Sequence, residues 1–192
     1  MTRDAIPGRV ATDLRSLPSG VVDLRAMGMG PTGVAAVCLV DPGTVRVEHA
    51  VGEIERVFSP DLEEMDPATT VTEDRLDQPW IVFETTPERF EELVASLVFA
   101  VDSLFDRGYG DYPFVAAVEL HSPHEGRLYL FYRFDERGFY PFAPRPEGRR
   151  RHSGLERKVA DAIREELTLL ADEDDWTPVW GPDGSVHPWN ES

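Results

Sequence analysis

The chain has 192 residues, 41% of them hydrophobic, and a formal net charge of −17. This length fits one domain, which buries about 70% of the surface that the open chain would expose. The charge opposes binding to nucleic acids and to bare anionic lipid, because their phosphates repel an acidic protein.

The basic residues are almost all arginine. The chain has 36 acidic and 19 basic residues, and Lys158 is the only lysine. Such acidity with almost no lysine is typical of halophilic proteins, in which salt screens the self-repulsion of the surface. We therefore interpret the charge as salt adaptation rather than as a choice of partner.

The sequence carries no signal for export or membrane insertion. The N-terminus lacks the apolar region of a secretory signal, and no stretch approaches the roughly 18 uninterrupted apolar residues of a membrane-spanning helix. The single cysteine, Cys38, excludes an intramolecular disulfide, which favours a reducing compartment. Cys38 lies in an apolar run, so we expect its thiol to be buried. The lack of an export signal and of a disulfide together predict a cytoplasmic protein.

The first part of the chain predicts short helices and strands separated by glycine and proline. Apolar residues three and four positions apart predict helices, while alternation and short apolar runs predict strands. We read Pro18 as the end of the first helix. In chain order the expected elements are a helix over 11–17, a strand over 21–27, a turn over 28–33, a strand over 33–40, a helix over 47–58 and a hairpin over 69–74 and 80–85.

The clearest predicted element is a helix over 86–108. Thr86 is suited to cap it, Pro87 fits its first turn, and Gly108 is a typical residue at the C-terminal end. Its spacing predicts one apolar stripe that faces the core. The stripe consists of Phe90, Leu93, Val94, Leu97, Val101 and Leu104.

The second half predicts an antiparallel meander followed by a last helix. Strands over 114–120, 127–134 and 139–144 are joined by short turns. Pro141 makes the third an edge strand, because proline cannot donate to a central ladder. The last helix begins at Ser153, in a capping box with Glu156, and its apolar face extends to Leu170.

These elements predict an α+β fold, with an antiparallel or mixed sheet and about three packed amphipathic helices in two layers. We expect one domain over 1–181 and a loose C-terminal tail over 182–192. Trp176 and Trp180 should dock back on the domain, because they carry too much apolar surface to leave in water.

No motif for catalysis or metal binding rises above background. The chain has no HExxH, no GxSxG and no GxxxxGK[ST] pattern. His121 and His124 share one turn, and we interpret them as solvated rather than as metal ligands. Pairs of carboxylates carry no signal in a chain with 36 acids. We expect no catalytic residue, no metal and no cofactor.

The densest basic cluster stands beside the most aromatic segment. Arg149, Arg150 and Arg151 follow the sequence FYPFAP of residues 139–144. Either the arginines pair with the chain's own acids, for which we favour Arg150 with Asp175, or they form a contact for an anion or an acidic partner. The candidate contact residues are Phe139, Tyr140, Arg149, Arg150, Arg151, Trp176 and Trp180.

Several segments together carry a resemblance to a known family. They are FYPFAP, the pair Arg150-Arg151, the helical pattern from Leu155 to Leu167, DWTPVWG (175–181), LPSGVVDL (17–24), PTGVAAVC (31–38), and Trp80 with Val82. In these segments, over nearly its whole length, the chain resembles the PspA-associated protein family called PspAB. FYPFAP and WTPVWG are the most specific of them.

The resemblance implies a cellular context rather than a chemistry. It implies a non-enzymatic accessory or regulatory protein of a PspA-type envelope-stress, or phage-shock, response. The implied partners are the PspA coiled coil or a membrane-bound heat-shock metalloprotease, which would place the protein at the inner face of the membrane. The family occurs in actinobacteria and haloarchaea, and the acidic composition favours a haloarchaeal source.

Two other functions stay open. One is a small-ligand-binding enzyme or sensor with a pocket near Tyr140, Arg150 and Trp180. The other is a secretion-chaperone-like peptide binder, which rests on the α+β layout alone. Convergence of Tyr140 and the arginines on one concave pocket would favour the ligand. An exposed patch formed by the aromatic residues of FYPFAP and WTPVWG would favour the protein partner.

Overall fold

The computed structural model describes residues 5–40, 46–58, 67–74, 76–145, 149–181 and 187–189. Six strands form one antiparallel sheet in the order β2-β3-β1-β4-β5-β6. The strands are β1 (Gly30–Leu39), β2 (Ala68–Glu73), β3 (Pro79–Glu84), β4 (Pro113–Ser122), β5 (Gly126–Arg133) and β6 (Gly138–Phe142). A separate short pair consists of β7 (Pro144–Arg145) and β8 (Arg150–Arg151).

The described residues also include five α-helices, more than the three or so expected. They are α1 (Ala5–Arg15), α2 (Leu17–Ala26), α3 (Arg46–Val57), α4 (Phe90–Asp106) and α5 (Ser153–Ile163). Two short 3₁₀ turns are η1 (Pro87–Arg89) and η2 (Glu173–Asp175). The α+β class and the antiparallel sheet are confirmed.

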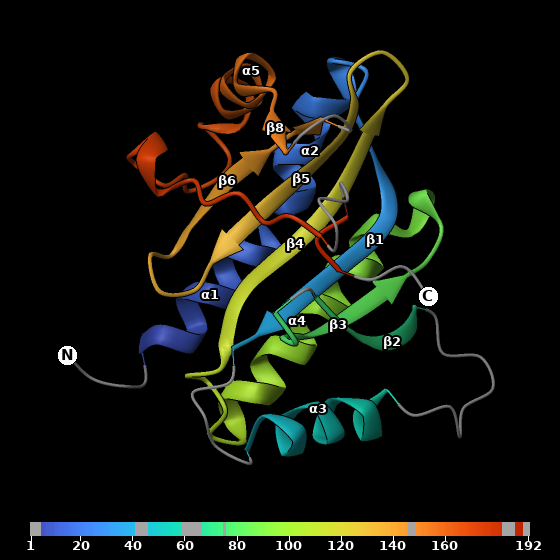
Figure 1. Ribbon diagram of the computed structural model, residues 1–192, viewed down its shortest axis with the longest axis vertical. Helices are drawn as coiled ribbons and strands as arrows, with labels where there is room; N and C mark the ends of the chain where they lie inside the picture. Colours follow the sequence, from blue (N-terminus) through green and yellow to red (C-terminus); the bar gives the residue numbers. More distant parts are fainter. Residues whose placement is uncertain are drawn as a thin grey trace.

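Both faces of the sheet are covered. Helices α1, α2 and α4 lie behind it in Figure 1, while the C-terminal segment, drawn in red, crosses its front. The alternation of β1 reflects these two cores, because Ala35, Val37 and Leu39 belong to the helix-side core and Ala36 and Cys38 to the opposite one. This burial on both sides explains why the strand reads as an almost continuous apolar run.

The predicted meander is confirmed, with β4, β5 and β6 paired in order. Strand β6 is the edge of the sheet, as Pro141 indicated. The edge is nevertheless covered by the chain itself. The Phe139 N–H donates to the Thr168 carbonyl at 2.8 Å, and the Leu170 N–H donates to the Phe139 carbonyl at 2.9 Å. Residues 168–170 therefore close an edge that would otherwise offer unpaired backbone groups.

Helix α4 carries the predicted stripe, all of whose members are buried. Gly108, at φ +81°, follows the helix, and the Tyr109 N–H bonds to the Leu104 carbonyl at 2.8 Å, which completes a Schellman motif. The N-terminal end differs from the prediction. Thr86 precedes the 3₁₀ turn η1 and makes no side-chain capping hydrogen bond.

The strand predicted over 21–27 is wrong, because residues 21–26 belong to α2 and Met27 is its C-cap. Leu17, Val21 and Leu24 are buried at helical spacing, and Pro18 occupies the first turn instead of ending a helix. Gly28 adopts a φ of +77° just after the helix, and the Met29 N–H donates to the Leu24 carbonyl at 3.0 Å. The proline and the glycine are therefore the two ends of one helix.

The capping box predicted at the start of α5 is also wrong. The N-cap is His152, whose Nδ1 accepts from the Leu155 N–H at 3.3 Å. Glu156 turns inward and accepts from the Ala143 N–H at 2.9 Å. The helix ends at Ile163, and Leu167 and Leu170 reach the core from the irregular segment that follows.

The expected loose tail packs on the domain where the structure describes it. Trp189 is 5% exposed, with its ring centroid 5.1 Å from that of Trp80 and 5.8 Å from that of Tyr129. Residues 182–186 and 190–192, the rest of that expectation, lie outside the described residues.

Candidate interaction surface

A C-terminal strap, which we define as residues 172–181 and 187–189, covers the face of the sheet opposite the helices. That face is aromatic and fully buried: it holds Trp80, Tyr129, Phe131, Tyr140 and Phe142. The strap contributes three tryptophans. Trp176 is 6% exposed, Trp180 packs edge-on against Phe142 with the ring centroids 5.1 Å apart, and the Trp189 ring packs at a tilt against Trp80. The expectation that WTPVWG docks on the domain is confirmed.

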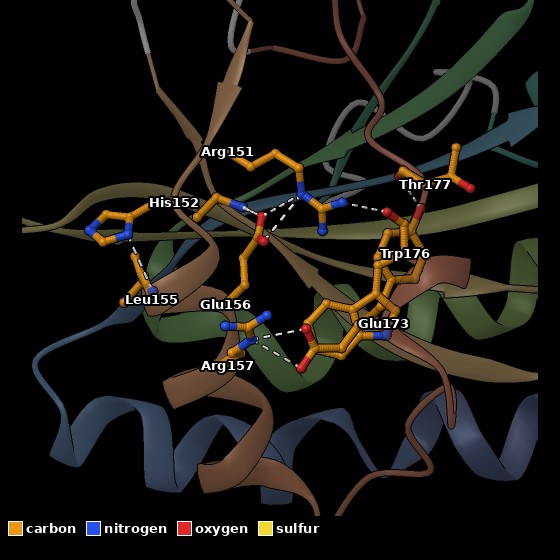
Figure 2. Close-up of polar contacts among 10 residues, drawn as sticks. Arg151, His152, Leu155, Glu156, Arg157, Glu173, Trp176 and Thr177 are labelled. Carbon is orange, nitrogen blue, oxygen red and sulfur yellow. Dashed lines mark hydrogen bonds and ion pairs between the residues drawn. The ribbon is translucent and has the colours of Figure 1, made fainter.

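Arg151 connects the strap to the last helix (Figure 2). Its Nε–H donates to both carboxylate oxygens of Glu156, at 3.1 and 3.2 Å, and its Nη1 donates to the Trp176 carbonyl at 2.6 Å. Its guanidinium lies 5.8 Å from the ring centroid of Phe142. Glu156 is 1% exposed, so its charge is compensated inside the protein rather than by water.

The favoured pairing of Arg150 with Asp175 does not form among the described residues, and two other arginines contact the strap instead. Arg151 bonds a backbone carbonyl of the strap, and Arg157 bonds the Glu173 carboxylate at 2.9 and 3.1 Å (Figure 2). Within the described residues, Arg150 lies exposed on β8, opposite Arg145. The anchoring is thus shifted by one residue along β8, because alternate residues of a strand face opposite sides.

The predicted contact residues divide into buried and exposed members. Phe139 and Tyr140 are each 1% exposed and belong to the core. Arg149, at φ +52°, and Arg150 face solvent, and Trp180 is partly buried. The exposed patch that would have favoured a partner at FYPFAP and WTPVWG is therefore not formed.

The ligand pocket suggested near Tyr140, Arg150 and Trp180 gains no support. The Tyr140 hydroxyl donates to the Thr177 carbonyl at 2.9 Å, and the Trp180 ring packs on Phe142. The groups that a ligand would need are occupied by the strap, and Arg150 faces solvent.

Sequence reasoning missed a buried polar cluster beneath the strap. Glu119, 5% exposed on β4, accepts a hydrogen bond of 3.1 Å from the Tyr129 hydroxyl. Arg127 Nε lies 3.6 Å and His187 Nδ1 lies 3.8 Å from its carboxylate oxygens. A glutamate inside the apolar strand FVAAVEL was the available signal, since a buried carboxylate requires partners. The cluster ties the strap to the sheet.

Sequence reasoning also missed an open groove on the helical side. It has a volume of about 440 Å³ and runs along α4, with Arg15 of α1 and Pro18 of α2 on its other wall. Phe99 lines it, is 54% exposed and makes an edge contact with Phe58, with the ring centroids 5.9 Å apart. The signal was present, because Phe99 stands outside the core stripe of α4. The lining residues are Arg15, Pro18, Glu91, Val94, Ala95, Val98, Phe99 and Asp102.

The described residues show neither a metal-ligand cluster nor a membrane-spanning helix. In the parts of the chain that the structure describes, no group of three histidine, cysteine or acidic side chains is placed to hold a metal ion. No helix among those residues combines the length and the apolar composition needed to cross a membrane. Cys38 is buried, as expected, and burial raises the pKa of its thiol far above the ordinary value.

The fold and these surfaces define an acidic α+β protein whose six-stranded antiparallel sheet is closed by helices on one face and by a C-terminal strap on the other. The chain belongs to the family described as PspA associated protein B, whose model matches residues 3–189. The name associates the family with PspA, a protein partner, which is consistent with an accessory role. Comparison with curated proteins and comparison with solved structures each found no match.

Proposed function

We propose that the chain is a non-enzymatic accessory protein of a PspA-type envelope-stress response and that it acts by binding a protein partner on the cytoplasmic side of the membrane. The observation that carries the proposal is the family match over residues 3–189, since the family name states an association with PspA. The groove along α4 supports it, because an exposed aromatic side chain in an apolar depression is typical of interaction sites.

The proposal is tested by direct binding between the purified full chain and the PspA protein of the same organism. Light scattering after gel filtration and titration calorimetry, each at several salt concentrations, should detect a complex of defined stoichiometry. An unrelated protein of equal negative charge is the control. A complex that persists when salt screens surface charge supports the proposal. Absence of a complex at every salt concentration contradicts it for this partner, and the heat-shock metalloprotease is then the second partner for the same assay.

A further inference from the structure

We infer that the groove between α2 and α4 binds an amphipathic helix of a partner protein, one whose apolar stripe is bordered by lysine or arginine on the side that faces α4. The inference rests on the proposed function and deepens it, because it names the kind of segment that the partner inserts. The groove lies on the helical side of the molecule, away from the strap.

The groove residues on α4 are spaced one helical turn apart, which suits the packing of a second helix against them. Val94 and Val98 are one turn apart on α4, and so are Ala95 and Phe99, so the four side chains form two short rows. Pro18 lines the opposite wall. A channel between two helices accepts the side-chain ridge of a third, as in helix-in-groove recognition.

The apolar surface continues beyond the groove. Val22 stands one turn after Pro18 on α2 and is 62% exposed, while Phe99 is 54% exposed. Single exposed apolar side chains are ordinary on protein surfaces, but Phe99 lines the groove and Val22 stands one helical turn from Pro18, which also lines it. The remaining outward positions of α4 are mostly polar, so Phe99 is unusual for its place on the helix.

The charge around the groove determines which charged residues should border the apolar stripe of the partner helix. Exposed carboxylates follow the outer side of α4 and of the turn before it, at Glu88, Glu91, Glu92 and Asp106, and the partly buried Asp102 adds a fifth. The Arg15 guanidinium, from the other side of the groove, lies 3.4 Å from Asp102, and Arg89, which directly precedes α4, pairs with Glu92. Carboxylates therefore remain in excess beside α4. Partial burial raises the pKa of Asp102, Arg15 opposes this shift, and the neighbouring Asp106 adds to it.

The same charges argue against a second copy of this chain as the occupant. Each copy has a formal net charge of −17 and would bring further carboxylates to the acidic side of α4. A helix with an apolar stripe and basic borders would pack on the apolar lining of the groove and pair with the carboxylates beside α4. A helix with acidic borders would pack on the apolar lining but would be repelled by those carboxylates.

The first experiment uses the full chain and fluorescently labelled synthetic helices of about 18 residues, which span five turns. One peptide has a leucine stripe bordered by lysines, a second has the same composition with the stripe scrambled, and a third has the stripe bordered by glutamates. We expect anisotropy to report the tightest binding for the first. Equal binding of the scrambled peptide would overturn the inference, because charge alone would then explain the attraction.

Variants locate the site on the protein. F99A and E91K should each weaken binding of the lysine-bordered peptide about tenfold or more. The matched controls are L76A, which removes another exposed apolar side chain, and E73K, which makes the same charge change on β2. They should leave binding unchanged. A circular dichroism melt checks that all four variants fold, and equal losses in the controls would overturn the assignment.

Different results would overturn the groove inference and the proposed function. If the PspA complex forms but F99E leaves its affinity unchanged, the groove inference is overturned and the proposed function stands. If the lysine-bordered peptide binds in a Phe99-dependent manner but PspA does not bind, the groove stands and that partner is rejected. A dimer of the native chain that F99E converts to monomer would overturn the inference in favour of self-association.

Discussion

The Glu156 carboxylate and the Arg151 guanidinium form a bridge in which one nitrogen contacts both oxygens, at 3.1 and 3.2 Å, while the glutamate side chain is 2% exposed. The same carboxylate accepts the Ala143 N–H at 2.9 Å, and the same guanidinium holds the Trp176 carbonyl. One buried charge therefore joins the end of β6, helix α5 and the strap.

Removal of Glu156 should destabilise the protein strongly. E156A leaves the Ala143 N–H without its acceptor and the Arg151 guanidinium, 23% exposed, without its counter-charge. Loss of one partner of a buried pair costs about 3–5 kcal/mol. Urea unfolding at constant ionic strength measures it. E165A, at an exposed position after α5, is the control and should change the free energy by less than about 0.5 kcal/mol.

Two double-mutant cycles should separate the buried bridge from the exposed one. Arg157 and Glu173 are 63% and 50% exposed, so their coupling should be about 0.2–1 kcal/mol and should fall with added salt. The coupling of Arg151 with Glu156 should be larger and less dependent on salt, because Glu156 is buried and Arg151 is only 23% exposed. Equal couplings with equal salt dependence would contradict the burial argument.

Truncation of two phenylalanines should destabilise the protein by very different amounts. F142A removes a fully buried ring from the aromatic face and should cost about 3–5 kcal/mol. F99A removes a ring that is 54% exposed and should cost less than about 1 kcal/mol. Urea unfolding of both variants provides the comparison. A large loss for F99A would mean that this ring supports the fold rather than a surface.

A chain that ends at Ala171 should lose stability and expose its aromatic face. The truncation removes Trp176 and Trp189, which cover Tyr140, Trp80 and their neighbours. We expect a lower melting temperature and binding of a hydrophobic dye, since a large apolar surface would face water. An unchanged melting curve would show that the strap contributes nothing to stability.

Stability should decline in alkali because of three buried acids. Burial raises the pKa of the Cys38 thiol from 9.0 and those of the Tyr132 and Tyr140 phenols from 10.0. A raised pKa in the folded state favours the neutral form, so its stabilisation is complete below the unfolded pKa and is lost as pH rises toward the folded one. The unfolding free energy should therefore fall above about pH 9. C38A should show a shallower decline between about pH 9 and 10, and an identical slope would reject the role of the thiol.

The correct prediction of α4 and the wrong prediction at α2 show when a local sequence pattern is enough to identify a helix. The stripe of α4 repeats over many residues and ends in a glycine, so one interpretation fits it. In α2 the residues VVDLRAM satisfy both alternation and helical spacing over a short window. The helix is selected because Leu17, Val21 and Leu24 then meet the core together and Pro18 and Gly28 fit its ends. Long-range packing decided between two locally acceptable structures.

The arginine cluster shows the corresponding limit for the site. Its composition left open whether the arginines pair within the chain or contact a partner, and in the structure Arg151 bonds the Trp176 carbonyl of the strap. Which arginine does so depends on the strand β8, which directs Arg151 toward Glu156 and leaves Arg150 in solvent. The groove around Phe99 was equally hidden, because its walls come from helices far apart in the sequence.

By itself, the sequence determined the α+β class, the buried cysteine, the edge position of FYPFAP, the docking of WTPVWG and the resemblance to the PspAB family, because each depends on residue type, periodicity or motif within one segment. Only the tertiary structure decided that Glu156 is a buried counter-ion instead of a cap, that the strap seals the aromatic face, and that an apolar groove with an acidic rim lies open beside α4. These features depend on which distant side chains become neighbours, and burial, charge compensation and surface shape arise only when they do.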